Sequence, residues 1–298
     1  MISKKAQDFW TLLKSYPKQI EMPLAQAREA DLHAEDFTSE PKGVRFSPAP
    51  EVGGLWAEPP DTAPGRSILY FFGGGFVLGT PATRRKTAGH LALAAKARVL
   101  VPNYRLAPEH PFPAALDDAV RAYQFLLDHG AEPLKTVVSG DSAGGGLAVS
   151  TVIAVRDRHL PMCAGIAALS PWADLTCSGD STTSCAATDI ECTRAGLLEM
   201  AGWYINGADP AQPLASPVFA DLTGLPPLLC IAGGDEELLD DSVRLVRNAG
   251  TAGVNATLYI AAGMQHVWAI WAGAFPEADA AIALVGDWVR AHTGESAT

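Results

Sequence analysis

The sequence predicts an α/β fold with a mainly parallel sheet of eight strands, flanked by helices on both faces. Short apolar runs alternate with helix-length segments, and 48% of the 298 residues are hydrophobic, enough to bury a large core. We expect strands at 43–47, 53–57, 67–72, 98–104, 136–140, 164–169, 227–232 and 256–261. We expect helices at 82–97, 113–129, 143–158, 193–206, 238–250 and 277–292.

Two regions break this alternation. Residues 1–40 precede the first strand and carry helix-like apolar positions, and residues 173–217 are too long for a simple crossover between strands. Ligands of such sheets bind beyond the carboxyl ends of the strands, so an insertion there covers the site. We therefore predict a helical cap formed by both regions, on a domain spanning residues 41–298. The candidate pocket residues of the cap are Met22, Leu197, Trp203 and Tyr204. An equally good interpretation is that these side chains only pack the cap helices together.

The segment Gly140-Asp141-Ser142-Ala143-Gly144 has the form G-x-S-x-G. An apolar strand precedes it and a run of small residues with helical character follows it. A sharp turn between a strand and a helix holds a serine in a strained backbone conformation, and small flanking residues make that turn sterically feasible. The pattern predicts that Ser142 is an exposed nucleophile. A turn that only caps a helix is the alternative.

His266 is the best candidate for the base that a nucleophilic serine needs. Of the seven histidines, it alone lies in a short loop directly after a late apolar strand, 256–261. The other six lie in helix-like, turn-like or terminal segments. The position of His266 places its imidazole at the carboxyl end of the sheet, where Ser142 is also expected.

The acid that orients the base is expected between the serine and the histidine, because serine turns of this kind use the chain order Ser, Asp/Glu, His. Asp235 is the first carboxylate after the buried strand 227–232, and we predict that it is the acid. Glu236 is the local rival. Asp240 and Asp241 fall further into the next helix, where acidic residues complement the helix dipole.

A glycine-rich turn after strand 67–72 is a candidate oxyanion hole. Its segment, Gly73-Gly74-Gly75-Phe76, lets the backbone approach a ligand with no side chain in the way. The N–H groups of Gly74, Gly75 and Ala143 are the expected donors to the developing negative charge.

At this point the sequence resembles the bacterial hormone-sensitive-lipase-like esterases of the α/β-hydrolase fold. Over about residues 40 to 292, the resemblance rests on four motifs: Tyr70-Phe71-Phe72-Gly73-Gly74-Gly75-Phe76, Tyr104-Arg105-Leu106-Ala107-Pro108-Glu109-His110-Pro111-Phe112-Pro113-Ala114-Ala115, Gly140-Asp141-Ser142-Ala143-Gly144-Gly145 and Ser170-Pro171-Trp172. It implies hydrolysis of small-molecule carboxylic esters, no cofactor and a helical cap. Asp235 and His266 fall where that family keeps its acid and base.

One position departs from the family pattern. The family usually has a histidine before the three glycines, and this chain has Phe72. That histidine fixes the loop without transferring protons, so packing by Phe72 would serve the same purpose. Phe72 is also a candidate substrate-binding residue.

The proline-rich segment 104–115 is expected to be a stiff support behind the glycine loop rather than part of the chemistry. Within it, Arg105 and Glu109 are expected to form a partly buried ion pair.

Charge and cysteine content exclude other classes of function. The net charge of −11 opposes binding to nucleic acid or to an anionic membrane surface. No apolar stretch reaches the length of a spanning helix, and the first residues do not resemble a signal peptide. The spacing of Cys177, Cys185 and Cys192 fits no zinc pattern, so we expect no metal. The odd number of cysteines, five, and the lack of a signal-peptide pattern predict reduced thiols in a cytoplasmic enzyme.

Three questions stay open at the level of sequence. A lactone hydrolase or an amidase would use the same triad. A non-catalytic receptor for a small ligand on the same fold is a remote alternative, and the presence of His266 argues against it. Homodimers are common in the family, so the 277–292 helix is a candidate for an edge that joins two copies.

Overall fold

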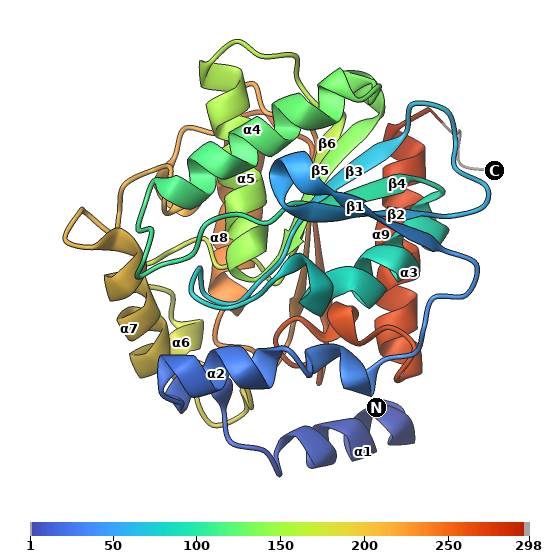
Figure 1. The fold of residues 1–298 in the computed structure, drawn as a ribbon. Helices are drawn as coiled ribbons and strands as arrows, with labels where there is room; N and C mark the ends of the chain where they lie inside the picture. Colours follow the sequence, from blue (N-terminus) through green and yellow to red (C-terminus); the bar gives the residue numbers. More distant parts are fainter. Residues whose placement is uncertain (1, 295–298) are drawn as a thin grey trace.

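The computed structural model describes residues 2–294 and confirms the predicted α/β architecture (Figure 1). Residue 1, in the predicted cap region 1–40, and residues 295–298, in the predicted domain 41–298, lie outside the described residues. The eight strands form one sheet in the order β1-β2-β4-β3-β5-β6-β7-β8. They are β1 (Arg45–Ala49), β2 (Gly54–Glu58), β3 (Ser67–Phe71), β4 (Arg98–Val101), β5 (Thr136–Asp141), β6 (Gly165–Leu169), β7 (Leu228–Gly233) and β8 (Ala256–Ala261). The pairs β1–β2 and β2–β4 are antiparallel, and all the others are parallel.

The burial of each strand follows from its place in the sheet. Every residue of β3, β5, β6 and β7 is buried, as expected for parallel strands that are covered on both faces. The edge strand β8 has no fully buried residue, and its Tyr259 and Ile260 are 42% and 46% exposed. The central strands therefore read as continuous apolar runs in the sequence.

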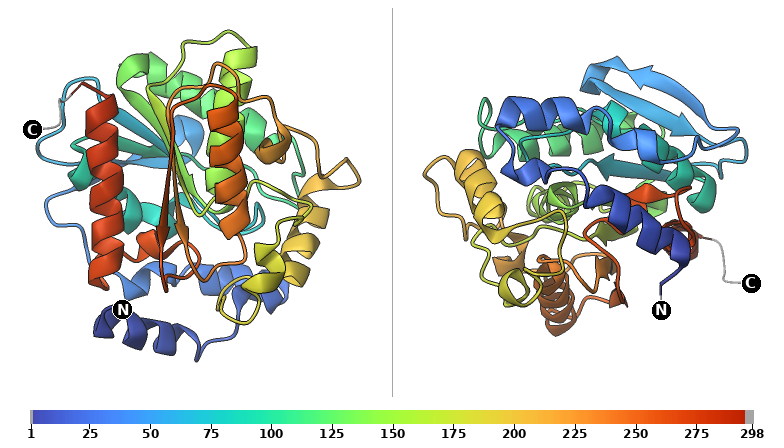
Figure 2. Two further views of the ribbon diagram at one scale, coloured as in Figure 1. Left: turned by 180° about the vertical axis from the view of Figure 1, so that it is seen from behind. Right: turned by 90° about the horizontal axis from the view of Figure 1, so that it is seen from below.

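Helices cover both faces of the sheet (Figure 2). The helices α3 (Arg85–Ala95) and α9 (Pro276–His292) pack together on one face. On the other face lie α4 (Ala114–Asp128), α5 (Ala143–Asp157) and α8 (Leu239–Thr251). All the predicted strands and helices are present, with ends that shift by a few residues.

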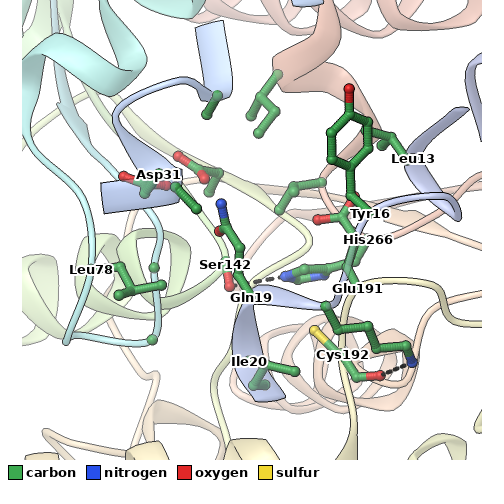
Figure 3. Close-up of a pocket in the computed structure, with 18 of the residues that line it drawn as sticks. Leu13, Tyr16, Gln19, Ile20, Asp31, Leu78, Ser142, Glu191, Cys192 and His266 are labelled. Carbon is green, nitrogen blue, oxygen red and sulfur yellow. Dashed lines mark hydrogen bonds between the residues drawn. The ribbon is translucent and has the colours of Figure 1, made fainter. Parts of the chain in front are cut away.

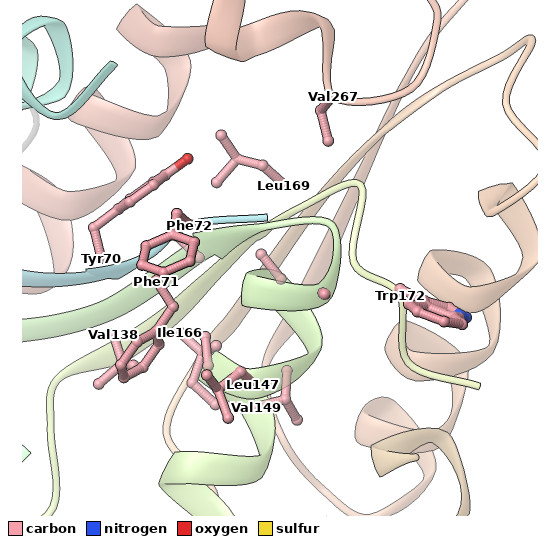
Figure 4. Close-up of a cluster of buried hydrophobic side chains, with 14 of the residues drawn as sticks. Tyr70, Phe71, Phe72, Val138, Leu147, Val149, Ile166, Leu169, Trp172 and Val267 are labelled. Carbon is pink, nitrogen blue, oxygen red and sulfur yellow. The ribbon is translucent and has the colours of Figure 1, made fainter. Parts of the chain in front are cut away.

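The core packs against the central strands (Figure 4). Tyr70 and Phe71 of β3, Val138 of β5 and Ile166 of β6 are fully buried, together with Leu147 of α5. Burial of large apolar side chains is the main favourable contribution to folding. The core therefore fixes the ends of β3, β5 and β6, from which the site is built.

The two regions outside the alternation lie at one end of the sheet, as Figure 1 shows. The first contains α1 (Lys4–Leu13) and α2 (Leu24–Asp31), and the second contains α6 (Ser181–Ser184) and α7 (Arg194–Ile205). No helix within residues 2–294 is long and apolar enough to cross a membrane.

The proline-rich segment joins the first of these regions to the sheet. Arg28 of α2 forms two hydrogen bonds of 2.7 Å to the carboxylate of Glu109, and its Nε donates to the carbonyl of Val77. Arg105 instead pairs with Asp118 at 2.8 Å. The expected Arg105–Glu109 pair is therefore wrong, because each residue has a better-placed partner on a neighbouring helix.

Candidate active site

Ser142 occupies the sharp turn between β5 and α5. Its backbone is at φ 53° and ψ −123°, a conformation that residues with a side chain rarely adopt. The turn is held because Ser142 N donates to the carbonyl of Leu169 at 2.9 Å. A Cβ at Gly144 would overlap the carbonyl oxygen of Phe71, so the close approach of α5 to β3 needs glycine there.

The hydroxyl of Ser142 lies against the imidazole of His266 (Figure 3). The distance from Ser142 Oγ to His266 Nε2 is 2.9 Å, and that from His266 Nδ1 to Glu236 Oε2 is 3.3 Å. His266 is 4% exposed and Glu236 is fully buried. With Nδ1–H donating to the carboxylate, Nε2 is free to accept the proton of the serine.

The carboxylate beside His266 is that of Glu236, and the prediction of Asp235 for this place is corrected. Both residues follow β7, but Asp235 remains partly exposed. Its backbone is held in the turn, where N donates to the carbonyl of Met264 at 3.1 Å and its own carbonyl accepts from Thr188 Oγ1. The next residue enters the interior, and the longer glutamate side chain spans the distance to the imidazole.

Ser170 is a further residue of this network. Its Oγ donates to Glu236 Oε2 at 2.7 Å and accepts from the backbone N–H of Val267 at 3.1 Å. One hydroxyl therefore ties the end of β6 to both Glu236 and the loop that carries His266. The motif Ser170-Pro171-Trp172 is visible in the sequence, but nothing in its residue types indicates this contact.

The charges of the network are set by burial and by the contacts within it. Burial raises the pKa of Glu236, and the hydrogen bond from His266 opposes that shift. Burial also opposes a charged imidazole, but the Glu236 carboxylate beside Nδ1 raises the pKa of His266 above its usual value. The Cys192 thiol has a pKa raised to about 12 by burial, so it is neutral at physiological pH.

The predicted oxyanion donors come from two segments next to the pocket, the glycine turn after β3 and the start of α5. Gly74 and Gly75 line the pocket together with Ser142. Gly74 has φ 113°, which a residue with a side chain would not adopt without strain. Ala143 is the first residue of α5, where N–H groups have no acceptor within the helix. This arrangement suits a developing oxyanion.

The hydroxyl opens into a pocket of about 640 Å³. Both regions of the predicted cap line it, and among the expected pocket residues Met22 and Leu197 do so. The rest of its wall includes the apolar side chains of Leu13, Ile20, Leu78, Met200, Val267, Ile270 and Trp271. The polar side chains at its wall include Gln19, Asp31, Arg84 and Glu191.

Phe72 packs behind the glycine loop and is not part of the pocket wall, which corrects its assignment to substrate binding. It is fully buried and stacks on Tyr104, with ring centroids 4.2 Å apart. The hydroxyl of Tyr104 donates to the carbonyl of Phe72 at 2.7 Å. Packing of Phe72 therefore holds the glycine loop, as the sequence suggested for a chain that lacks the family histidine.

Trp203 and Tyr204 also lie outside the pocket wall. Tyr204 stacks on Phe76 with ring centroids 3.9 Å apart, and Trp203 packs, half-buried, against the core. They lie about one turn after Met200 and two turns after Leu197, which do face the cavity, so the direction of α7 decides which of its residues reach the site.

The cysteines form no further site. All five are free and buried. Across residues 2–294, no group of three or more histidine, cysteine, aspartate and glutamate side chains is arranged to hold a metal ion.

Known proteins resemble this chain over almost its whole length. A family model described as the alpha/beta hydrolase fold matches residues 68–270. An acetyl-hydrolase of Streptomyces hygroscopicus is 40% identical over 283 residues, which cover 90% of this chain and 95% of that protein.

Solved structures agree with these matches. An esterase from the bacterial hormone-sensitive lipase family superposes with a TM-score of 0.93 at 36% identity, over 99% of this chain and all of the other. The crystal structure of EstE5 soaked by p-nitrophenyl butyrate gives a TM-score of 0.90 at 40% identity, over 98% of this chain and 99% of the other.

Proposed function

We propose that this chain, which belongs to the hormone-sensitive-lipase-like esterase family of the α/β-hydrolases, hydrolyses short- to medium-chain esters through an acyl-serine intermediate. It is a carboxylic ester hydrolase. The observation that carries the proposal is the continuous hydrogen-bonded series Ser142, His266 and Glu236 at the floor of an apolar pocket. The Streptomyces relative is an acetyl-hydrolase and the EstE5 crystal was soaked by p-nitrophenyl butyrate, which favours short acyl chains.

Acylation begins with proton transfer. His266 Nε2 takes the proton of Ser142 as Oγ attacks the ester carbonyl, and the buried Glu236 stabilises the imidazolium that forms. The N–H groups of Gly74, Gly75 and Ala143 stabilise the oxyanion; one such donor is worth roughly a hundred- to a thousandfold in turnover. His266 then protonates the leaving alkoxide.

Deacylation repeats these steps with water. His266 takes a proton from a water molecule that attacks the acyl-serine, the same N–H groups hold the second oxyanion, and the acid leaves when Ser142 regains its proton.

The two cap regions set the substrate range in this proposal. Residues of 1–40 and 173–217 close the pocket around its apolar wall, and their side chains limit its length. A volume of about 640 Å³ suits a small ester, within the usual range of ligand pockets. We therefore expect a preference for acyl chains from acetate to octanoate.

The test is a series of p-nitrophenyl esters from acetate to laurate, with lactones and anilides assayed in parallel. We expect kcat/KM to be highest for the shorter esters, and Ser142→Ala to lower kcat about a millionfold, as triad removal does elsewhere. Substantial ester hydrolysis by pure Ser142→Ala protein would remove Ser142 from this role. A higher kcat/KM for lactones or anilides would reassign the natural reaction to that class.

We also propose that the enzyme works in a reducing compartment, the cytoplasm. All five cysteines are free, and burial raises the thiol pKa of Cys163 and Cys230 to about 12, so these side chains act as small apolar groups. Fractionation of the native cells, with the protein outside the cytoplasmic fraction, would contradict this location.

A further inference from the structure

We propose that Asp31 forms a polar subsite of the ester pocket and selects esters that carry a hydrogen-bond donor, a hydroxyl or an ammonium group, away from the ester bond. This inference rests on the proposed esterase function and adds the class of substrate to it. It concerns a residue of α2, in the region that precedes the sheet, which the triad chemistry does not use.

Asp31 is a buried carboxylate with an unused oxygen. It is the last residue of α2, is 5% exposed and lies at the pocket wall. Within residues 2–294, its Oδ2 has no hydrogen-bond partner, whereas Oδ1 faces Arg84 Nη1 at 4.0 Å. Buried carboxylate oxygens are rarely left without a donor, because the loss of hydration is then uncompensated.

The charges around Asp31 leave one negative charge unbalanced. Arg84 is the cation of this cluster, and its Nε donates to Asp141 Oδ2 at 3.1 Å. The hydroxyl of Tyr70 donates a hydrogen bond to the other oxygen of Asp141, Oδ1, at 2.8 Å. Arg84 therefore serves two carboxylates and is closer to Asp141. Burial and the neighbouring Asp141 raise the pKa of Asp31, whereas Arg84 and the Thr83 side chain lower it.

Asp31 and Ser142 line the same pocket, so a substrate bound at Ser142 shares a cavity with this carboxylate. Asp141 directly precedes Ser142, so the cluster of Asp31, Arg84 and Asp141 extends from α2 to the nucleophile. Figure 3 shows Ser142 between Asp31 and His266. In this apolar wall, a donor on the substrate would supply the missing hydrogen bond, and an alkyl group of the same size would leave it unmade.

Glu191 is the competing acceptor and must be separated by the experiment. It also lines the pocket, and its buried Oε1 likewise has no partner within the described residues. In Figure 3 it lies next to His266, on the other side of Ser142 from Asp31. Arg84 and Asp141 make Asp31 part of a fixed polar cluster, so we assign the subsite to Asp31.

The experiment compares esters that differ only in the donor. Ethyl 3-hydroxybutyrate is paired with ethyl 3-methylbutyrate, and 2-(dimethylamino)ethyl butyrate with 3,3-dimethylbutyl butyrate, while ethyl butyrate reports the basal activity. The kcat/KM of each is measured by titrating the released acid. The enzymes are the native chain, Asp31→Leu, Asp31→Asn, Glu191→Gln and, as a control for charge on the same helix, Glu29→Gln, whose side chain is exposed.

We expect the native enzyme to prefer at least one donor ester over its partner by about tenfold, which corresponds to about 1.4 kcal/mol. Asp31→Leu abolishes that preference, and Asp31→Asn abolishes it for the ammonium ester, while Glu29→Gln and Glu191→Gln retain it. Asp31→Asn keeps the shape of the side chain, so it serves if Asp31→Leu does not fold.

Equal kcat/KM within both pairs for the native enzyme overturns the proposal without any variant. A preference that survives in both Asp31 variants, or is lost only in Glu191→Gln, overturns it as well. Hydrolysis of ethyl butyrate without donor preference leaves the esterase function intact and refutes only the subsite. Hydrolysis of none of the five esters refutes the esterase function and this inference with it.

Discussion

At the residue scale, two adjacent carboxylates show how little separates a catalytic position from a supporting one. Asp235 and Glu236 follow the same strand, but only Glu236 enters the interior and contacts His266. Asp235 stays in the turn, where its backbone bonds to Met264 and Thr188. We propose the orienting role for Glu236 because it is buried and contacts His266, although Asp235 is the first carboxylate after the strand.

Substitution of the two carboxylates tests this assignment. Glu236→Gln should lower kcat about ten-thousandfold, because the amide favours the wrong tautomer and no longer stabilises the imidazolium. Asp235→Asn should change kcat by less than about tenfold, equivalent to less than about 1.4 kcal/mol of barrier. Steady-state kinetics on p-nitrophenyl butyrate measure both variants. The reverse order of effects would restore Asp235 to the triad.

The pH dependence follows from the same contacts. Neutral His266 is the active base, and its raised pKa means that the neutral form is reached only at higher pH. The kcat/KM should therefore rise with pH, with a midpoint above the ordinary imidazole value of about 6.5. A pH profile with a stable alkyl ester checks this. A midpoint at or below the ordinary value would mean that burial outweighs Glu236.

At the scale of elements, the site forms where the ends of separate strands and loops meet. The turn after β5 carries Ser142, the end of β6 carries Ser170, and the segments after β7 and β8 carry Glu236 and His266. Parallel strands bring their carboxyl ends to one edge, so these four residues meet although 124 positions separate Ser142 from His266. The strands supply rigidity and the loops supply the functional groups.

Ser170→Ala tests how the end of β6 positions the triad. The variant removes the donor to Glu236 and leaves the Val267 N–H without its acceptor. We expect kcat to fall about ten- to a hundredfold with little change in KM, because the loss is one of orientation and amounts to about 1.4–2.7 kcal/mol. Ser170→Thr, which keeps the hydroxyl, should recover part of the rate. A change in KM alone would show that Ser170 acts on the pocket instead.

Phe72→His tests the packing of the glycine loop. The oxyanion donors are backbone groups, so turnover should stay within about tenfold of the native value. The free energy of unfolding should fall by about 1–3 kcal/mol, because a polar ring replaces one that is fully buried and stacked on Tyr104. Denaturant titration and ester assays measure the two effects. A thousandfold change in turnover would show that this position sets the oxyanion geometry.

At the scale of the whole molecule, distant segments complete the active site. The region before β1 reaches the pocket through α2, which Arg28 anchors to Glu109 and to the carbonyl of Val77. The region between β6 and β7 reaches it from the other side, where Lys18 Nζ donates to the carbonyl of Cys192 at 3.1 Å. The two regions therefore contact each other at the carboxyl ends of the parallel strands, and together they close one pocket.

The edge of the sheet indicates how two copies would associate. Among the eight strands, β8 ends the sheet, and its Tyr259 and Ile260 are exposed. Unpaired edge strands with apolar side chains favour pairing with another chain. We expect a homodimer through β8, and Ile260→Lys should shift it to a monomer in light scattering after gel filtration. A native chain that is monomeric at high concentration would contradict this expectation.

The sequence by itself determined the strands, the helices, the serine turn and the histidine loop, because these depend on local periodicity, on glycine at strained positions and on short motifs. Only the tertiary structure decided which carboxylate meets His266, that Ser170 joins the network, and that Phe72, Trp203 and Tyr204 pack away from the pocket. Those outcomes depend on the direction of a side chain at the end of a strand or on a helix face. The elements packed around a residue set that direction, and its neighbours in the sequence do not.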